Sequence, residues 1–299
     1  MIVLPITNQD TVQMEGGQNI FKLIFAYFFI VGIFQLIAYN YLGLEISNYE
    51  FVVKTPFQSL IISFVTLVGT LITIWVMMKF VDKKPFYTLG FKNHEIANDV
   101  CKGLFFGFII ILFGFGILFF LNQIQIQNVF FDVHSFFAGF LLFIFVGITE
   151  EVLVRGYILK NLLASFNAYI ALFISAFIFS VLHLGNPFIN FIGFIQLFVA
   201  GLLLGIPYVM TRKLWFSIAF HFSWNFFQGT IFGFNVSGHQ NYSIIETKFN
   251  SETVWNGGYF GFEGSILCLL FQLIVIAYFL LDNNKKSFKY LFDNELNKM

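Results

Sequence analysis

Long apolar segments dominate this 299-residue chain and limit what it can fold into. A helix needs about 20 apolar residues to cross the hydrocarbon core of a bilayer. Backbone groups cannot stay unpaired in lipid, and these segments are too long for barrel strands, so we expect helices. The sequence predicts an all-α polytopic membrane protein, a bundle of about eight transmembrane helices in a single membrane domain over 1–299. The segments are 20–40, 57–80, 102–122, 137–163, 168–185, 189–210, 214–234 and 263–282.

The composition supports this class. Charged residues make up 11% of the chain, against a usual value of about 25%, and 58% of the residues are hydrophobic. So few charges could not cover the surface of a soluble domain of this size. The net charge is zero, which gives no reason to expect a nucleic-acid partner. The lipid bilayer is the expected surrounding, and the sequence does not indicate an oligomeric state.

The basic residues indicate how the helices are oriented, because cytoplasmic loops carry an excess of Lys and Arg. Only Lys54 and Lys248 lie in the links after the odd-numbered segments. We therefore expect both termini in the cytoplasm and the Gly/Asn/Ser-rich loop 235–260 outside. The compact chain without a retention signal favours a bacterial plasma membrane. The residues in or beside the links after the even-numbered segments are Lys79, Lys83, Lys84, Lys92, Lys102, Lys160, Arg212, Lys213, Lys285, Lys286 and Lys289.

Two adjacent carboxylates and a guanidinium lie within the fourth apolar segment. Ionisable groups at that depth cost at least about 2.5 kcal/mol each and are a functional-site hypothesis by default. In a helix, Glu151 and Arg155 lie one turn apart on the same face and can pair, whereas Glu150 is rotated by about 100°. This spacing allows two roles, one acid neutralised by the cation and the other left to handle protons. A structural ion cluster that ties helices together is the alternative.

Other polar side chains fall within the fifth and seventh segments. His183 lies near the end of the fifth, while His221 and Asn225 are four residues apart in the seventh and share a face. Taken singly, these residues are typical of packed histidines and of hydrogen bonds between helices. Taken with the acids of the fourth segment, they are expected to meet in the bundle interior, because lipid would leave them unpaired. Carboxylate, imidazole and amide groups together are the equipment of water-activated acyl transfer.

The three motifs together resemble the CPBP family of intramembrane endopeptidases, which includes type II CAAX prenyl proteases, bacteriocin-processing and Abi proteins. The resemblance covers about 135–230, which we expect to be the catalytic core. Each motif alone is weak, but three in order within apolar segments are fairly specific. They are Glu150-Glu151-x-x-x-Arg155, Phe179-x-x-x-His183 and His221-x-x-x-Asn225.

The resemblance implies a catalytic role for each motif. Glu150 would activate the attacking water with His183, and His221 with Asn225 would stabilise the oxyanion. The substrate would be a peptide or protein at the membrane. The sequence does not identify which peptide; a prenylated protein, a leader peptide and a signal-like segment all remain open.

The remaining motif residues are given supporting roles. Glu151 and Arg155 would be an orienting pair, and Phe179 is assigned to substrate binding. Spacing alone does not decide which of the two glutamates is the base.

The need for a metal is also left open by the residues. Family members have been described both as metalloproteases and as metal-independent glutamate proteases. The chain has no His-Glu-x-x-His motif, although two histidines and a carboxylate could hold Zn²⁺. We favour a mechanism that requires no cofactor, because His221 with Asn225 suits an oxyanion hole better than a ligand set.

One geometric difficulty concerns depth in the membrane. At about 1.5 Å per residue from the cytoplasmic ends, His221 would lie about 10 Å deep, Glu150 roughly 15–20 Å and His183 about 24 Å. Straight upright helices could not bring them level. A break near Gly185-Asn186-Pro187 or helix tilt would reconcile these depths.

Two other functions compete with proteolysis. Buried charges also relay protons or bind ions in transporters, but the acids here are confined to one segment and paired broken helices are not apparent. A non-catalytic immunity or scaffold protein could retain the family's residues. Loss of an acid or an imidazole would separate these functions, because a scaffold would keep its phenotype.

Overall fold

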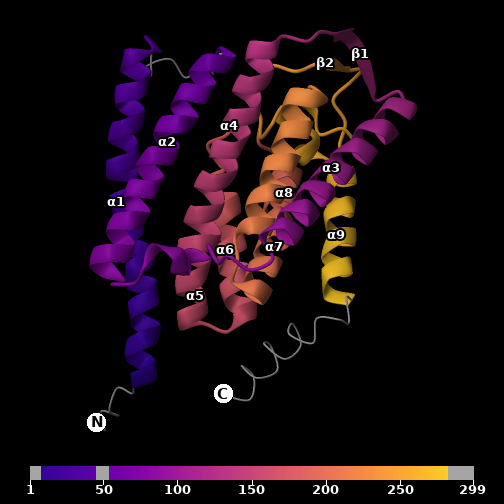
Figure 1. The fold of residues 1–299 in the computed structure, drawn as a ribbon. Helices are drawn as coiled ribbons and strands as arrows, with labels where there is room; N and C mark the ends of the chain where they lie inside the picture. The colour runs from indigo at the N-terminus through magenta and orange to yellow at the C-terminus, as the bar shows by residue number, and fades with distance from the viewer. Residues whose placement is uncertain (1–7, 45–53, 282–299) are drawn as a thin grey trace.

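The structure is a computed structural model that describes residues 8–44 and 54–281, a helical bundle with a small β-ribbon at one end (Figure 1). Within the described residues, helices cover most of every predicted apolar segment, which confirms the all-α membrane fold. The α-helices are α1 (Asn8–Tyr41), α2 (Pro56–Val76), α3 (Ile96–Phe120), α4 (Val133–Glu151), α5 (Lys160–Ser165), α6 (Ala168–Leu182), α7 (Phe191–Thr211), α8 (Trp215–Asn225) and α9 (Ile266–Leu281). The π-helical and 3₁₀ segments are η1 (Met77–Val81), η2 (Phe86–Leu89), η3 (Val152–Leu159), η4 (Phe226–Ile231), η5 (Gly258–Phe260) and η6 (Phe262–Gly264).

Among the described residues, five helical stretches are long and apolar enough to cross a membrane. The helices α6 and α9 are also apolar but shorter, with 15 and 16 residues. The chain is therefore an integral membrane protein. The five long stretches are Gly16–Tyr41, Pro56–Val81, Ile96–Phe120, Val133–Ser165 and Phe191–Thr211.

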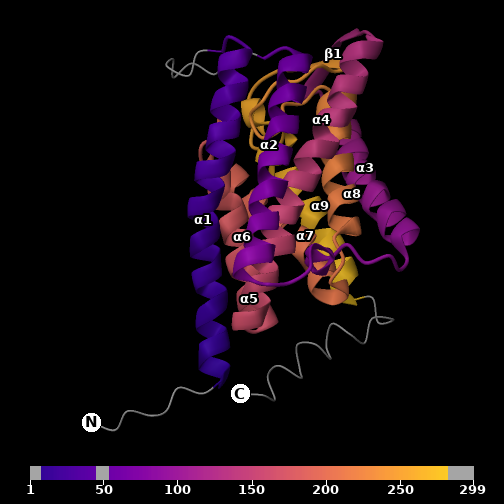
Figure 2. The same cartoon turned by 60° about the vertical axis from the view of Figure 1, so that its left-hand side comes forward.

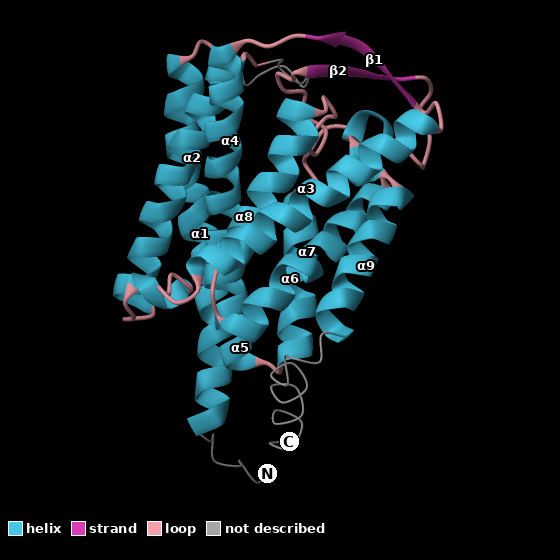
Figure 3. Ribbon diagram, turned by 45° about the vertical axis from the view of Figure 1, so that its right-hand side comes forward, coloured by secondary structure: helices cyan, strands magenta, loops and turns pink. Residues whose placement is uncertain are grey.

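A two-stranded antiparallel ribbon lies at the end of the bundle where α2 and α4 begin (Figure 3). It pairs β1 (Ile124–Val129) with β2 (Ile245–Phe249). Neither strand was predicted: β2 lies within the predicted loop 235–260, and β1 lies between the third and fourth predicted segments. Strand β1 leads into α4, and β2 lies in the long loop before α9. The ribbon therefore joins two loops that are far apart in the sequence.

The opposite end of the bundle is closed by the segment between α2 and α3. Its 3₁₀ turn η2 buries Leu89 completely, and the Leu89 carbonyl accepts a hydrogen bond from Tyr208 Oη at 3.0 Å. The next residue, Gly90, accepts from Leu214 N at 3.1 Å, at the turn between α7 and α8. This segment is therefore a packed cover over the helix ends.

Side-chain caps define where three of the helices begin. Asp132, Asn167 and Asn190 precede α4, α6 and α7, and each accepts a hydrogen bond from a backbone N–H three residues later, at 2.7, 3.0 and 2.8 Å. Such caps satisfy N–H groups that the helix itself leaves free. The Ser135 N–H that bonds to Asp132 holds the pKa of that carboxyl below its usual range. Two of the capped helices, α4 and α6, carry predicted site residues.

Two glycines let α3 cross closely over α8, the helix that carries His221 and Asn225 (Figure 1). A Cβ added at Gly103 would lie 2.6 Å from the Phe216 carbonyl oxygen, and one at Gly107 would lie 2.7 Å from that of Phe220. Small residues four apart are a common means of close helix packing in membranes. Ser223 Oγ of α8 adds a hydrogen bond of 2.7 Å to the α3 backbone at Leu104. The position of α8 therefore depends on this glycine pair.

We expect Gly107→Ala to destabilise the protein by about 1–3 kcal/mol, because the added methyl group meets backbone atoms that cannot move independently. The matched control is Gly116→Ala on the same helix, where an added Cβ has nothing within 4 Å. Thermal unfolding of both variants in detergent checks this expectation. Equal melting temperatures for the two variants would contradict the close α3–α8 packing.

Candidate active site

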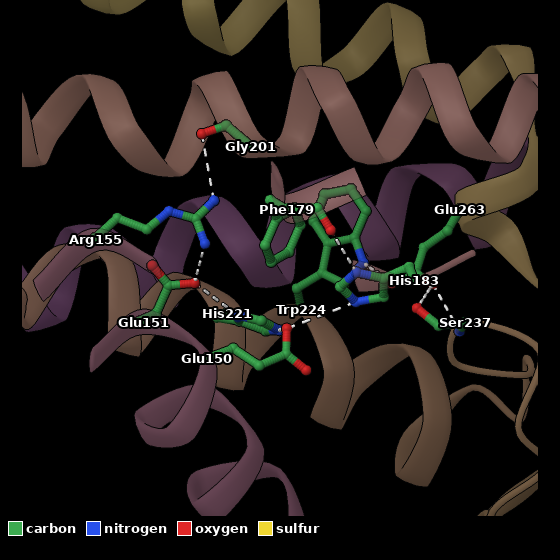
Figure 4. A network of polar contacts seen from close by, with 10 residues as sticks. All are labelled: Glu150, Glu151, Arg155, Phe179, His183, Gly201, His221, Trp224, Ser237 and Glu263. Atoms are coloured by element: carbon green, nitrogen blue, oxygen red, sulfur yellow. Dashed lines mark hydrogen bonds and ion pairs between the residues drawn. The ribbon is translucent and has the colours of Figure 1, made fainter. Parts of the chain in front are cut away.

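The predicted motif residues come together from three separate parts of the bundle (Figure 4). Helix α4 ends at Glu151 and continues without a break as the π-helix η3, in which every residue, Arg155 included, is buried. Short π-helical segments inside helices are rare and often occur at functional sites. Helix α6 supplies the Phe179 motif, and α8 supplies the His221 motif.

Glu151 is the centre of a buried ionic network. Its Oε1 accepts hydrogen bonds from Arg155 Nη1 and from His221 Nδ1, both at 2.8 Å. Arg155 Nη2 also donates to the Gly201 carbonyl of α7 at 3.3 Å. The side chains of Glu151 and Arg155 are completely buried. The network therefore joins α4 to α7 and α8 and fixes the His221 ring with its Nδ1 turned toward the carboxylate.

His183 is held at the end of α6 by a backbone hydrogen bond. The helix ends at Leu182, and His183 Nδ1 lies 2.8 Å from the Phe179 carbonyl oxygen. A carbonyl oxygen only accepts, so we assign the proton to Nδ1. The other ring nitrogen, Nε2, lies 3.6 Å from Glu150 Oε2.

Glu150 differs from Glu151 in what surrounds its carboxylate. Its Oε2 lies 3.6 Å from His183 Nε2 and 3.8 Å from His221 Nε2, and it makes no hydrogen bond with another protein atom. The Glu150 side chain is 29% exposed, whereas that of Glu151 is 0% exposed. Glu151 Oε2 also makes no hydrogen bond with protein atoms, but Glu151 Oε1 is held by two donors in a completely buried side chain, whereas Glu150 faces the cavity between two imidazoles. Figure 4 shows this difference directly.

Phe179 packs against the charged groups of the site. Its ring centroid lies 4.3 Å from Arg155 Cζ and 4.7 Å from the centroid of the His183 ring. A guanidinium over an aromatic face is an attractive arrangement, more so where water is excluded. The structure therefore gives Phe179 a packing role, and its contact with substrate stays a prediction.

Asn225 lies one turn beyond His221 on α8 and is 4% exposed. It lines the same cavity as Glu150, His183 and His221. Its amide is thus available to a group bound there.

The predicted difference in depth is resolved by where the helices end. Because α6 ends at Leu182, just before Gly185-Asn186-Pro187, His183 is at the terminus of a short helix. Both imidazole Nε2 atoms lie within 3.8 Å of one Glu150 oxygen, so the three helices do bring these groups level.

The site opens into a cavity of about 1130 Å³. Glu150, His183 and His221 line it together with apolar side chains of α1, α2, α4, α6 and α7. Some of its lining side chains also face outward: Phe28 of α1 is 70% exposed and Leu182 of α6 is 48% exposed. The wall between α1 and α6 is therefore open to the side, and Figure 2 shows α1 at the outer edge of the bundle. The volume is large enough for a peptide segment.

The sequence analysis did not include Glu263, although it is 5% exposed and lines the cavity. Its Oε1 accepts a hydrogen bond from Trp224 Nε1 at 3.1 Å, and its Oε2 accepts two from Ser237, through N and Oγ, at 2.7 Å each. Trp224 precedes Asn225 on α8, and Ser237 lies in the loop over the cavity. Glu263 therefore holds this loop on α8. The only feature of the sequence that could have indicated a role for Glu263 is its position at the edge of an apolar segment.

A second polar group was also missed. Gln196 of α7 and Gln272 of α9 are 1% and 0% exposed and line the cavity. Gln196 Nε2 lies 3.3 Å from Cys268 Sγ, while Gln196 Oε1 and both polar atoms of the Gln272 amide make no hydrogen bond with protein atoms. Buried amides of this kind are costly unless a bound group or water completes them. The sequence did not predict these two residues as part of the site, because a single glutamine in an apolar segment forms no recognisable motif.

The His, Cys, Asp and Glu side chains of the protein are the possible ligands of a metal ion. Within the described residues, no three or more His, Cys, Asp or Glu side chains are placed so that they could hold a metal ion. The metal-free mechanism stays a prediction, which a chelator can test.

The comparison with protein families gives a match across the site. Residues 132–227 match the family model described as type II CAAX prenyl endopeptidase Rce1-like. This segment is Rce1-like. The Rce1-like segment covers about a third of the chain and contains all of the motif residues from Glu150 to Asn225. The resemblance stated from the motifs is thus confirmed. The comparisons with curated proteins and with solved structures gave no match.

Within the Rce1-like segment, we expect Glu151→Ala to lower the stability of the fold by about 3–5 kcal/mol, because it leaves Arg155 buried without its counter-charge. Glu150→Ala should cost much less, since that carboxylate makes no hydrogen bond with the protein through its buried oxygen. Thermal unfolding of the two variants in the same detergent makes the comparison. Similar losses for both would show that the two acids are equivalent in the fold.

Proposed function

We propose that this protein is an intramembrane endopeptidase that hydrolyses a peptide bond of a membrane-associated peptide or protein by activating a water molecule. The Rce1-like match supports this class of reaction, since type II CAAX prenyl endopeptidases are peptidases. The observation that carries the proposal is the position of Glu150 Oε2 between the Nε2 atoms of His183 and His221.

The contacts of the two acids support Glu150 as the general base. Glu151 Oε1 already accepts from both Arg155 and His221, so proton uptake there would break the buried network. Glu150 is open to the cavity and can accept a proton from water without breaking an existing hydrogen bond through Oε2. His183 Nε2, with its proton assigned to the other ring nitrogen, can share this proton and pass it to the leaving amine.

Stabilisation of the oxyanion falls to His221 and Asn225. His221 Nδ1 is committed to Glu151, so donation from Nε2 to an oxyanion requires the protonated imidazolium. Two carboxylates face one guanidinium in the site, so a protonated His221 would leave the cluster neutral. That charge balance is favourable in a medium of low dielectric. The Asn225 amide would supply a second donor from the same helix face.

The cavity walls fit a substrate that is held at the membrane. The open side between α1 and α6 exposes apolar side chains to lipid, and the acids lie behind it. An apolar part of a substrate could remain among these side chains while its peptide bond reaches Glu150.

We expect Glu150→Gln to reduce cleavage by about 10²–10⁴-fold while the protein remains folded, because the amide keeps the shape but cannot accept the proton. A comparative peptidome of membranes from cells expressing wild type or variant measures this effect. The matched control is Glu246→Gln, an exposed carboxylate of β2 outside the cavity. A scaffold or transporter would show the same peptides with both variants, and that result would reject the proposal.

Removal of metal provides a separate test of the mechanism. We expect the purified protein to keep its cleavage activity, on a substrate found in the peptidome, after dialysis against 1,10-phenanthroline. The protein dialysed without chelator is the control. Activity that is lost with the chelator and returns with added Zn²⁺ would favour a metalloprotease.

A further inference from the structure

The two ends of the bundle differ strongly in charge. At the end covered by η2, hydrogen bonds join the link after α2 to the start of α5 and to the link after α7: Lys160 Nζ donates to Thr88 Oγ1 at 3.2 Å, and Lys213 Nζ donates to the His94 carbonyl at 3.1 Å. Asn19 of α1 donates to Asp82 at 3.0 Å, which brings the start of α1 to the same end. The basic residues gathered at this end are Lys22, Lys79, Lys83, Lys84, Lys92, Lys102, Lys160, Arg212 and Lys213.

The end that carries the β-ribbon is nearly free of positive charge. Among the described residues, its Lys and Arg are Lys54 and Lys248. The ribbon, the start of α4 and the loop before α9 are joined there, for example by a hydrogen bond of 2.6 Å from Asp132 N to Tyr242 Oη. The positive-inside rule therefore assigns the η2 end to the cytoplasm and the ribbon end to the opposite side.

The cavity of the candidate active site reaches the ribbon end. Its lining includes loop residues from that end, namely Lys54, Asn186, Pro187, Phe188, Asn235, Ser237, Gly238, His239, Gln240, Asn241 and Tyr259. None of the described residues in the links 79–95, 160–167 or 205–219 lines it, and the lining nearest the η2 end consists of the apolar α1 side chains Ile20, Leu23 and Ile24. The cavity therefore connects Glu150 with the polar loops of the ribbon end.

A packed layer closes the cytoplasmic end beside the η2 turn. Leu89, Tyr157, Tyr208 and Leu214 are each no more than 1% exposed, and hydrogen bonds from Tyr208 and Leu214 hold Leu89 and Gly90 on the ends of α7 and α8. Tyr157 follows Arg155 in the buried π-helix, and its Oη donates to Asp82 at 3.1 Å. Substrate from the cytoplasm would have to displace this layer.

We propose that the substrate reaches the active site from the extracytoplasmic side of the membrane. This inference rests on the proposed peptidase function and narrows its substrate class to peptide segments exposed on that side. The amide, hydroxyl and lysine side chains at the mouth can bind a polar peptide backbone. The apolar opening between α1 and α6 accepts an apolar flank in the adjoining leaflet.

Access to thiol reagents tests the orientation without any substrate. The exposed Cys101 is replaced by Ser, and the buried Cys268 is kept. Single cysteines are then introduced as Gln240→Cys at the cavity mouth, Ser63→Cys in the α2 wall of the cavity, and Asn93→Cys at an exposed position of the link between α2 and α3. Spheroplasts of a bacterial host are treated with a sulfonated, membrane-impermeant maleimide before and after permeabilisation. The Cys101→Ser protein without an added cysteine gives the background.

We expect Gln240→Cys and Ser63→Cys to be labelled in intact spheroplasts and Asn93→Cys only after permeabilisation. Labelling of Asn93→Cys alone in intact spheroplasts would overturn the proposal, and so would a Ser63→Cys protein that is labelled only after permeabilisation. Either result would leave the peptidase function untouched, because labelling does not depend on catalysis.

The peptidome that compares wild type with Glu150→Gln then tests the substrate class. We expect the peptides that differ to derive from extracytoplasmic segments of membrane or exported proteins. Peptides from cytosolic proteins or from cytoplasmic loops would overturn the inference even if the labelling agreed. No difference at all, with outward labelling intact, would reject the peptidase function while the orientation of the cavity stood.

Discussion

The buried contact of Glu151 with Arg155 and His221 is the interaction on which the rest of the site depends. A completely buried ion pair offsets its lost hydration through good geometry and further hydrogen bonds, although Glu151 Oε2 and Arg155 Nε make none with protein atoms. Here one carboxylate oxygen accepts from both a guanidinium and an imidazole, and the guanidinium reaches a backbone carbonyl of α7. Because α4, α7 and α8 all contribute, the network also fixes how these helices lie relative to one another.

The network can be maintained only if α8 is held firmly, and backbone packing does this. The glycine pair of α3 lets the two helices approach until backbone touches backbone. On its other side, Ser217 Oγ of α8 donates to the Leu204 carbonyl of α7 at 2.8 Å. Contacts of this kind leave little freedom for α8 to slide or rotate. His221 and Asn225 therefore face the cavity in a fixed direction, as their proposed role as oxyanion donors requires.

The same arrangement separates two environments within the membrane. Below the Glu151 network, tightly packed side chains such as Leu89 and Tyr208 close the end that carries the basic loops. Above it, Glu150 borders a large cavity whose mouth is formed by polar loops. Glu263 holds one of these loops on α8 through Ser237 and Trp224. Glu150, the proposed base, is therefore open to the cavity, whereas the Glu151 side chain is completely buried.

The sequence by itself determined the membrane class, the helices and the identity of the motif side chains, because lipid forces backbone into helices and polar groups toward one another. Local periodicity could not show which glutamate stays free, the pairing of β1 with β2, the π-helix after Glu151, or the role of Glu263. Each of these depends on partners far away in the chain. For example, His221 forms a hydrogen bond with Glu151, and Ser237 donates one to Glu263. The tertiary structure alone brings such partners together, and so it alone assigned different surroundings to two adjacent acids.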